Sequence, residues 1–303
     1  MTKSNYKVAV IGATGLLGRA VASELAGVSR WDVVRTAFRR GDSTTETLDV
    51  RDEKAVRQFV AFHAPDAIVV TAAERRPDVC ENDPTLARAL NVDALRFIAD
   101  AARDCGAWAL SISTDYVFDG TKPPYQPDDT ANPLNAYGRS KLEGERALLD
   151  ASSRSCVLRL PLLYGPVIDW SESAVTSMTP SIVESARAAG IPAVMDAWAI
   201  RYPTFTPDIA VVIRQLLERC ENGNAMGGVV HWSGDEPMTK FEMAQHIARV
   251  LRVDANITPQ RTPFDLTPRP KDCHLSSSVL EEMGIGRRTP FDEAIRAVLR
   301  RSM

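Results

Sequence analysis

The sequence predicts an α/β protein with a doubly wound parallel sheet and a smaller C-terminal lobe. Over residues 1–163, short apolar runs alternate with segments of helical spacing. Several runs are apolar on both faces, which is typical of parallel strands covered by helices. The alternation stops after Pro161, and residues 164–205 are instead rich in Pro, Ser, Thr and aromatic side chains. We therefore expect a first domain over residues 1–163 and mainly a substrate-binding lobe over residues 164–303, from which segments can return to the main sheet.

Each expected element rests on its own pattern. The strands of the first domain are buried apolar runs, at residues 7–11, 31–37, 67–71, 108–113 and 156–160. Its helices have apolar residues at helical spacing or begin at a proline, at residues 16–25, 52–63, 84–105 and 137–149. In the lobe, the same patterns predict a strand at residues 228–232 and helices at residues 207–220, 240–251 and 291–301.

Composition is that of an ordinary globular protein and argues against several functions. The 303 residues are 45% hydrophobic and 25% charged, and a net charge of −3 gives no electrostatic reason to expect nucleic acid or an anionic membrane as a partner. The five cysteines contain no C-x-x-C pair and the four histidines no H-x-x-x-H pair, so neither a disulfide framework nor a metal site is expected. The polar start and the lack of a long apolar run predict a cytoplasmic protein.

A glycine-rich turn links the first expected strand to the first expected helix. Gly12 permits a tight turn, Gly15 lets the backbone approach a phosphate, and Gly18 lets the helix pack closely on the sheet. The free N–H groups and the positive end of the helix dipole favour an anion at this point. This order of strand, turn and helix predicts a Rossmann-type dinucleotide site, in which the turn also contributes Thr14, Leu16 and Leu17.

The charge that follows the second expected strand indicates which dinucleotide is bound. NAD binders place an acid there for the ribose 2′-hydroxyl, whereas this chain has Phe38, Arg39 and Arg40. A guanidinium fork suits a 2′-phosphate, so we expect NADP(H) rather than NAD(H). The rest of the expected cofactor site stands at the ends of the third, fourth and last strand regions of the domain, at Asp49, Val50, Ala72, Ala73, Pro161 and Leu162.

A Y-x-x-x-K pair predicts the catalytic groups. Tyr137 and Lys141 are four residues apart, which puts both side chains on one face of the expected helix. We expect the ammonium group to lower the pKa of Tyr137, so that its phenol is a usable proton donor, and Lys141 also to bind the nicotinamide ribose. Ser113 and Thr114 end the preceding strand, and we expect both hydroxyls to point into the cleft, where one binds a carbonyl oxygen.

Two strings carry a resemblance to a known family: residues 113–120 (STDYVFDG) and residues 133–138 (PLNAYG). Together with the glycine turn and the Y-x-x-x-K pair, they make the chain resemble the extended short-chain dehydrogenase/reductases, and within these the dTDP-4-dehydrorhamnose reductases. The resemblance covers essentially the whole chain. It implies a Rossmann-type fold, NADP(H) as cofactor and a catalytic triad of Thr114, Tyr137 and Lys141.

Further strings are similar to the regulatory β subunits of methionine adenosyltransferase, which are NADP-binding relatives of these reductases. They are residues 72–79 (AAERRPDV), 159–165 (RLPLLYG), 231–234 (HWSG) and 284–291 (GIGRRTPF). Leu162 stands where the rhamnose reductases usually carry a tryptophan for the sugar, which argues against a dTDP-sugar. The chain ends at Met303, short of the tail by which the β subunit docks in its catalytic subunit, so we expect weak or no docking of that kind.

Two functions therefore remain open. The first is an NADPH-dependent carbonyl reductase that acts on a small carbonyl substrate such as a 4-keto sugar nucleotide, and the intact triad favours it. The second is a regulatory subunit that keeps NADP as a ligand and has the methionine adenosyltransferase catalytic subunit as its partner.

Overall fold

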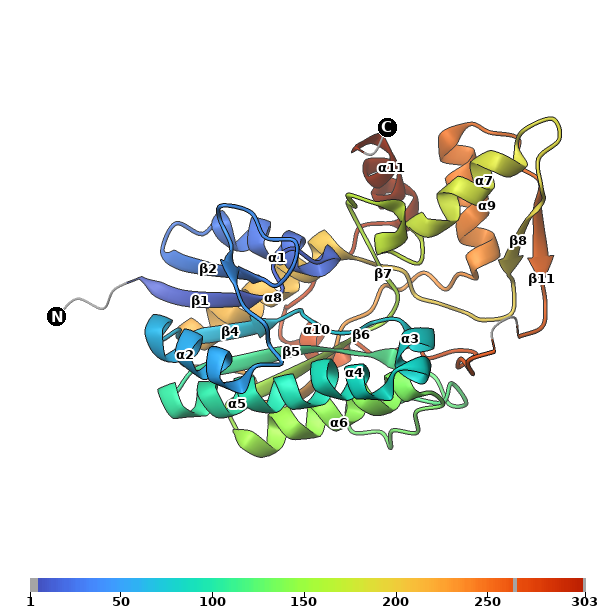
Figure 1. Cartoon of the computed structure of the whole chain (residues 1–303). Helices are drawn as coiled ribbons and strands as arrows, with labels where there is room; N and C mark the ends of the chain where they lie inside the picture. The colour runs from blue at the N-terminus through green and yellow to red at the C-terminus, as the bar shows by residue number, and fades with distance from the viewer. Residues whose placement is uncertain (1–4, 264–265, 302–303) are drawn as a thin grey trace.

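A computed structural model describes residues 5–263 and 266–301, and its centre is a seven-stranded parallel sheet (Figure 1). The strand order is β10-β6-β5-β4-β1-β2-β3. These strands are β1 (Tyr6–Ile11), β2 (Trp31–Ala37), β3 (Glu46–Thr47), β4 (Ala67–Val70), β5 (Trp108–Thr114), β6 (Ser155–Leu160) and β10 (Gly228–His231). The order reverses between β1 and β4, and doubly wound sheets bind their ligands beyond the carboxyl ends of the strands at such a point.

Helices cover both faces of the sheet (Figure 1). One face carries α1 (Leu16–Ala26), α8 (Thr206–Glu221) and α10 (Ser278–Glu282). The other carries α2 (Glu53–His63), α5 (Ala94–Cys105) and α6 (Ala136–Ala151). Because side chains alternate along a strand, Val8 and Val10 pack into the first layer while Ala9 and Ile11 pack into the second. The expected strands are apolar on both faces for this reason, and the expected fold class is confirmed.

The segment after β4 differs from the single helix expected over residues 84–105. It contains α3 (Pro77–Asn82), α4 (Pro84–Arg88), the π-helical turn η1 (Ala89–Asp93) and α5. Asp83 separates the first two helices, because its side chain accepts a hydrogen bond from the backbone N–H of Leu86 and so begins α4 at Pro84. The expected start at Pro84 is therefore correct, but α3 was missed and the helix is not regular throughout.

The smaller lobe has its own core. It contains α7 (Thr179–Ser185), α9 (Lys240–Leu251), α11 (Phe291–Arg301) and the two-stranded sheet of β8 (Ala193–Asp196) and β11 (Ile257–Gln260). Ile182, Ile247 and Ile295 meet in one buried cluster beneath these elements. A second two-stranded sheet, β7 (Leu163–Tyr164) with β9 (Thr204–Phe205), stands where the chain enters the lobe.

Part of the C-terminal half returns to the main sheet. β10 pairs in parallel with β6, and α8 packs beside α1 on the sheet. The polar start at residues 1–4 and the chain end at residues 302–303, on which the expectations about a leader and a tail partly rested, lie outside the described residues. No helix in the described ranges is both long and apolar enough to cross a membrane.

Candidate active site

The glycine turn lies at the carboxyl end of β1, where the strand order reverses. Gly12 has a φ of +86°, and a Cβ there would stand 2.8 Å from the backbone nitrogen of Ala72. A Cβ on Gly18 would stand 2.1 Å from the carbonyl oxygen of Gly12. Thr71, which the sequence analysis missed, donates to the carbonyl oxygens of Ile11 and Gly12 and so ties β4 to the turn. Protein contacts alone thus require Gly12 and Gly18.

Gly15 is different, because no protein contact explains it. Its φ is −73°, and a Cβ there would meet only the carbonyl oxygen of Gly12, at 3.4 Å. Gly15 is the N-cap of α1, and neither a side-chain cap nor an acidic residue is present in the first turn. A bare backbone at the positive end of a helix dipole fits a phosphate group. The residues of the turn therefore fit a dinucleotide pyrophosphate.

The residues expected at the adenosine end lie together. The Phe38 ring is half exposed, with the guanidinium groups of Arg39 and Arg51 at 5.4 Å and 5.1 Å from its centroid. Arg51 also holds Asp49 in an ion pair of 2.6 Å, and this hydrogen bond lowers the pKa of the carboxyl. Because β3 ends at Thr47, Asp49 lies in the turn after the strand and does not end it. Arg51 is a cation that the sequence analysis missed.

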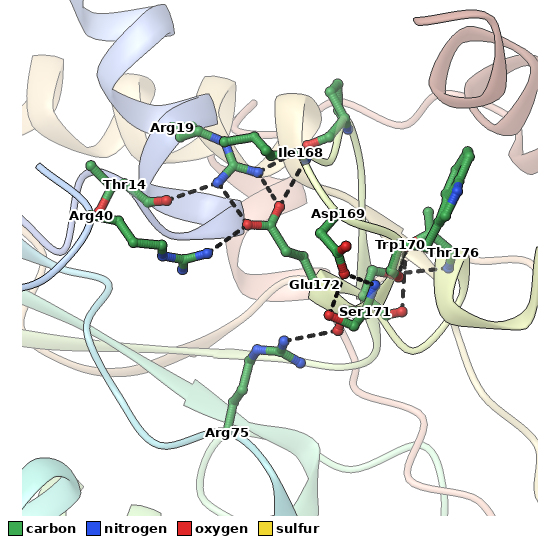
Figure 2. A network of polar contacts seen from close by, with 12 residues as sticks. Thr14, Arg19, Arg40, Arg75, Ile168, Asp169, Trp170, Ser171, Glu172 and Thr176 are labelled. Atoms are coloured by element: carbon green, nitrogen blue, oxygen red, sulfur yellow. Dashed lines mark hydrogen bonds and ion pairs between the residues drawn. The ribbon is translucent and has the colours of Figure 1, made fainter. Parts of the chain in front are cut away.

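Arg40 contacts a carboxylate from a distant segment (Figure 2). Its Nη1 donates to Oε1 of Glu172 at 2.8 Å, while Arg19 of α1 donates to both carboxylate oxygens. Burial opposes ionisation of Glu172, but the Arg19 hydrogen bonds, the backbone N–H of Ile168 and the charges of both arginines together lower its pKa. Arg19 and Glu172 were not predicted, since no local pattern links residues 153 positions apart.

The expected catalytic residues meet at the carboxyl end of β5. Asn135 caps α6 through the backbone N–H of Gly138, so Tyr137 stands in the first turn of the helix. The Thr114 side chain lies close enough to Tyr137 to lower the pKa of its phenol, while the Thr114 hydroxyl donates to Asp115 and accepts from the backbone N–H of Tyr116. Lys141, one turn further along α6, donates to the carbonyl oxygen of Ile112 at 2.7 Å. The structure therefore brings together Thr114, Tyr137 and Lys141.

The expected effect of Lys141 on Tyr137 is wrong for this structure. Burial raises the pKa of Tyr137 well above its ordinary value, and the interaction with Thr114 offsets only part of this. Burial also lowers the pKa of Lys141 to about 8, although Glu145 opposes the shift. The ammonium is hydrogen-bonded to the Ile112 carbonyl, and desolvation of the phenolate is the largest influence on the Tyr137 pKa. Tyr137 is a neutral phenol here, which retains a proton to donate.

Ser113 does not point into the cleft as expected. Its hydroxyl donates to the buried carboxylate of Glu145, which also forms a two-pronged ion pair with Arg159 of β6, at 2.7 Å and 2.9 Å. The Ser113 hydroxyl is thus committed to a buried ion pair, and Thr114 is the strand-end hydroxyl that lies near Tyr137. Ser113 instead fastens β5 to α6 from behind the catalytic residues.

The two lobes meet beside Thr114. Asp115 is buried, and burial raises its pKa to about 6, while the charge of Arg201 and the hydrogen bond from Thr114 oppose that shift. Arg201 lies between β8 and β9 and stands 5.6 Å from the ring centroid of Tyr116. The Tyr116 ring in turn packs edge-on against Tyr137 at 5.9 Å. Arg201 was missed because its partner is 86 residues earlier in the chain.

The remaining expected cofactor residues occupy two strand ends. Ala72 lies against the glycine turn and Ala73 is exposed beside it. Pro161 is buried after β6, while Leu162 packs on the core of the smaller lobe and accepts a backbone hydrogen bond from Thr204. Leu162 therefore contributes to the packing of the smaller lobe more than to the expected cofactor site. No group of His, Cys, Asp and Glu side chains in residues 5–263 and 266–301 forms a metal site.

Sequence comparison identifies the family. The family described as the RmlD substrate binding domain matches residues 6–303. This chain belongs to that family. It is 44% identical to methionine adenosyltransferase 2 subunit beta of Bos taurus over 97% of this chain and 87% of that protein. It is 31% identical to the dTDP-4-dehydrorhamnose reductase of Aggregatibacter actinomycetemcomitans over 78% of this chain and 76% of that protein. The expected family is confirmed.

Solved structures agree with this assignment. A dTDP-4-dehydrorhamnose reductase from Clostridium acetobutylicum superimposes with a TM-score of 0.84 at 27% identity, over 97% of this chain and 98% of that one. The enzyme from Bacillus anthracis, solved in complex with NADP, gives 0.84 at 25% identity, over 99% and 100% of the two chains. The whole fold, smaller lobe included, is therefore that of the reductases.

Proposed function

We propose that this chain binds NADP(H) with its pyrophosphate at the glycine turn and its 2′-phosphate at Arg39 and Arg40. The bare N-terminus of α1 and the uncrowded Gly15 support a pyrophosphate there, and the NADP complex of the Bacillus anthracis relative supports the choice of ligand. Arg39 and Arg40 would hold the 2′-phosphate, while Lys141 would bind the nicotinamide ribose. If the protein is a reductase, the bound dinucleotide would supply a hydride to its carbonyl substrate.

Calorimetric titration of NADPH and NADH tests this cofactor assignment. We expect the wild type to bind NADPH more tightly, because hydrogen bonds between charged partners contribute about 1.5–3 kcal/mol each. The double variant Arg39→Ala/Arg40→Ala should lose most of that preference and keep its NADH affinity. Equal affinities of the wild type for the two dinucleotides would contradict the assignment to NADP(H).

We further propose that the protein acts as an NADP(H)-binding regulatory subunit of the methionine adenosyltransferase β type. One observation carries this proposal: the 44% identity extends over 97% of the chain, whereas the reductase relative is 31% identical over 78%. The sequence alone favoured a reductase, and these identities reverse the order of the two functions. Its partner would be a methionine adenosyltransferase catalytic chain.

A carbonyl reductase is the second candidate, and the grouping of Thr114, Tyr137 and Lys141 favours it. Thr114 would hold the carbonyl oxygen of the substrate by a hydrogen bond, and Tyr137 would donate its phenolic proton to that oxygen. Lys141 would hold the ribose and stabilise the phenolate that remains. The carbonyl substrate would be of the sugar-nucleotide type, since the relatives of this family include dTDP-4-dehydrorhamnose reductases.

One experiment separates the two functions. The chain is co-purified with the methionine adenosyltransferase catalytic chain of the same organism, and S-adenosylmethionine synthesis is measured with and without it. In parallel, NADPH oxidation is followed with a panel of keto sugars and simple ketones. We expect a complex that changes S-adenosylmethionine synthesis and no NADPH consumption. Turnover of a carbonyl without a complex would reverse our order of preference.

A further inference from the structure

A segment of the smaller lobe lies beside the glycine turn, where its Pro166 and Glu172 accept hydrogen bonds from Arg19. It comprises residues 165–176, which we term the strap, and it includes the short helix η3 (Trp170–Glu172). Figure 2 shows Glu172 of the strap at the centre of a polar network that reaches α1 and the loop after β2. The carboxylate therefore joins the smaller lobe to two parts of the expected phosphate site.

Glu172 is fixed independently of Arg40. Arg19 donates to its two oxygens at 3.2 Å and 2.5 Å, and the backbone N–H of Ile168 donates at 3.1 Å. Arg19 is itself held by the carbonyl oxygen of Thr14 in the glycine turn, at 2.8 Å. The side chain of Glu172 is only 8% exposed. These three hydrogen bonds hold the buried carboxylate of Glu172 in a single position beside the glycine turn.

Arg40 is the less constrained partner by the same criteria. Its side chain is 64% exposed, and its ion pair with Glu172 uses Nη1 alone. Arg19 already neutralises the negative charge of Glu172. Glu172 therefore cancels little of the positive charge of Arg40. A long exposed side chain loses rotamer entropy when it binds a ligand, and a contact that fixes it beforehand reduces that cost.

We propose that Glu172 is a positioning residue that holds Arg40 for the ribose 2′-phosphate and thereby determines selectivity for NADP(H) over NAD(H). This inference rests on the proposed binding of NADP(H). Nη1 of Arg40 stays on Glu172, and the other guanidinium nitrogens face the phosphate. Arg39 supplies a second cation without this support, because it lies over the Phe38 ring. Selectivity thus depends on a residue of the smaller lobe as well as on the arginine pair.

Titration of Glu172→Gln and Glu172→Ala with NADPH, NADH, adenosine 2′,5′-bisphosphate and AMP tests the inference. The last two ligands differ only in the 2′-phosphate, and binding needs no turnover. We expect both variants to lose about fivefold or more in affinity for the two 2′-phosphate ligands and less than twofold for NADH and AMP. In an Arg40→Ala background, Glu172→Ala should have no further effect on selectivity.

Asp169→Asn is the matched control, since Asp169 is an acid of the same strap whose carboxylate accepts from Ser171 and not from an arginine among the described residues. It should leave all four affinities unchanged. Higher NADPH affinity in Glu172→Gln would show that the carboxylate repels the phosphate, and equal losses for NADPH and NADH would show that it only supports the strap. Either result would overturn the inference. A wild type that binds neither dinucleotide would instead refute the proposed function itself.

Discussion

At the scale of single residues, the state of Tyr137 depends on burial more than on the lysine beside it. The phenol is buried and packs edge-on against the Tyr116 ring, and this burial raises its pKa. Lys141 is directed to the carbonyl oxygen of Ile112. Tyr137 therefore keeps its proton at neutral pH, and its contribution to any reaction is that of an acid and not of a base.

This state predicts the behaviour of Tyr137→Phe. The variant removes one hydroxyl that makes no contact with the glycine turn, so NADPH affinity should stay within about twofold of wild type. Any carbonyl turnover should fall by about 100-fold or more, the usual loss when a general acid is removed. Steady-state kinetics and calorimetry on one preparation measure both quantities. Full turnover in the variant would exclude Tyr137 as the proton donor.

The sequence predicts which catalytic residues meet but not their ionisation. Spacing alone puts Tyr137 and Lys141 on one helix face, because the helical repeat is local. Desolvation is a tertiary quantity, and the Ile112 carbonyl that binds the ammonium belongs to another element. Glu172 was missed for a related reason, since its partners Arg19 and Arg40 lie 153 and 132 residues earlier in the chain.

At the scale of elements, the glycine turn separates fold requirements from ligand requirements. Gly18 stands where α1 meets the backbone of Gly12, so its lack of a side chain serves the packing of helix on strand. Gly15 has ordinary backbone angles and open space beyond one oxygen. The motif predicts both glycines equally, and only the structure distinguishes their roles.

Paired alanine substitutions test this distinction. Gly15→Ala should unfold at the same midpoint urea concentration as the wild type, because its Cβ meets only one atom, at 3.4 Å. It should nevertheless lose at least tenfold in NADPH affinity. Gly18→Ala should lose about 1–3 kcal/mol of stability, the usual cost of overpacking, as well as the ligand. Urea unfolding and calorimetry separate the two effects. Normal NADPH binding by Gly15→Ala would mean that the dinucleotide does not approach this turn.

Elements with strong local signals were predicted well, and those that depend on distant partners were not. The strand at residues 31–37 and the helix that ends at His63 match β2 and α2 at those bounds. α3 has only six residues, too few for a helical repeat to be recognised. The π-helical turn η1 depends on distant partners. It contains Asn91, whose buried side chain is hydrogen-bonded to the backbone of Glu74 and to the hydroxyl of Ser140.

At the scale of the whole molecule, the division into two lobes does not follow the order of the elements along the chain. β10 is a strand of the main sheet and α8 packs on that sheet, although both follow the first elements of the smaller lobe in the chain. Charged groups then link the lobes: Glu172 forms an ion pair with Arg19, and the charge of Arg201 acts on the buried Asp115. A sequence pattern cannot predict such pairs, because neither partner lies on a periodic face that indicates the other.

Asp115 predicts how stability at this junction depends on pH. Its pKa in the folded protein is about 6, above the unfolded value of about 3.8, because burial disfavours the charged form. Between these values the folded state binds more protons than the unfolded state, so this group adds stability as the pH falls and removes it as the pH rises through 6. The effect should appear in a comparison with Asp115→Asn, which does not titrate.

We expect the wild type to gain about 1 kcal/mol of unfolding free energy relative to Asp115→Asn when the pH falls from 7 to 5, since one pKa unit corresponds to about 1.4 kcal/mol. Urea unfolding of both proteins at the two pH values measures this difference, and other titrating groups cancel in it. Asp128→Asn, at an exposed carboxyl, should show no such difference from wild type. A constant gap between wild type and Asp115→Asn at pH 5 and 7 would mean that Arg201 keeps Asp115 ionised throughout, and that the lobes are joined by a full ion pair.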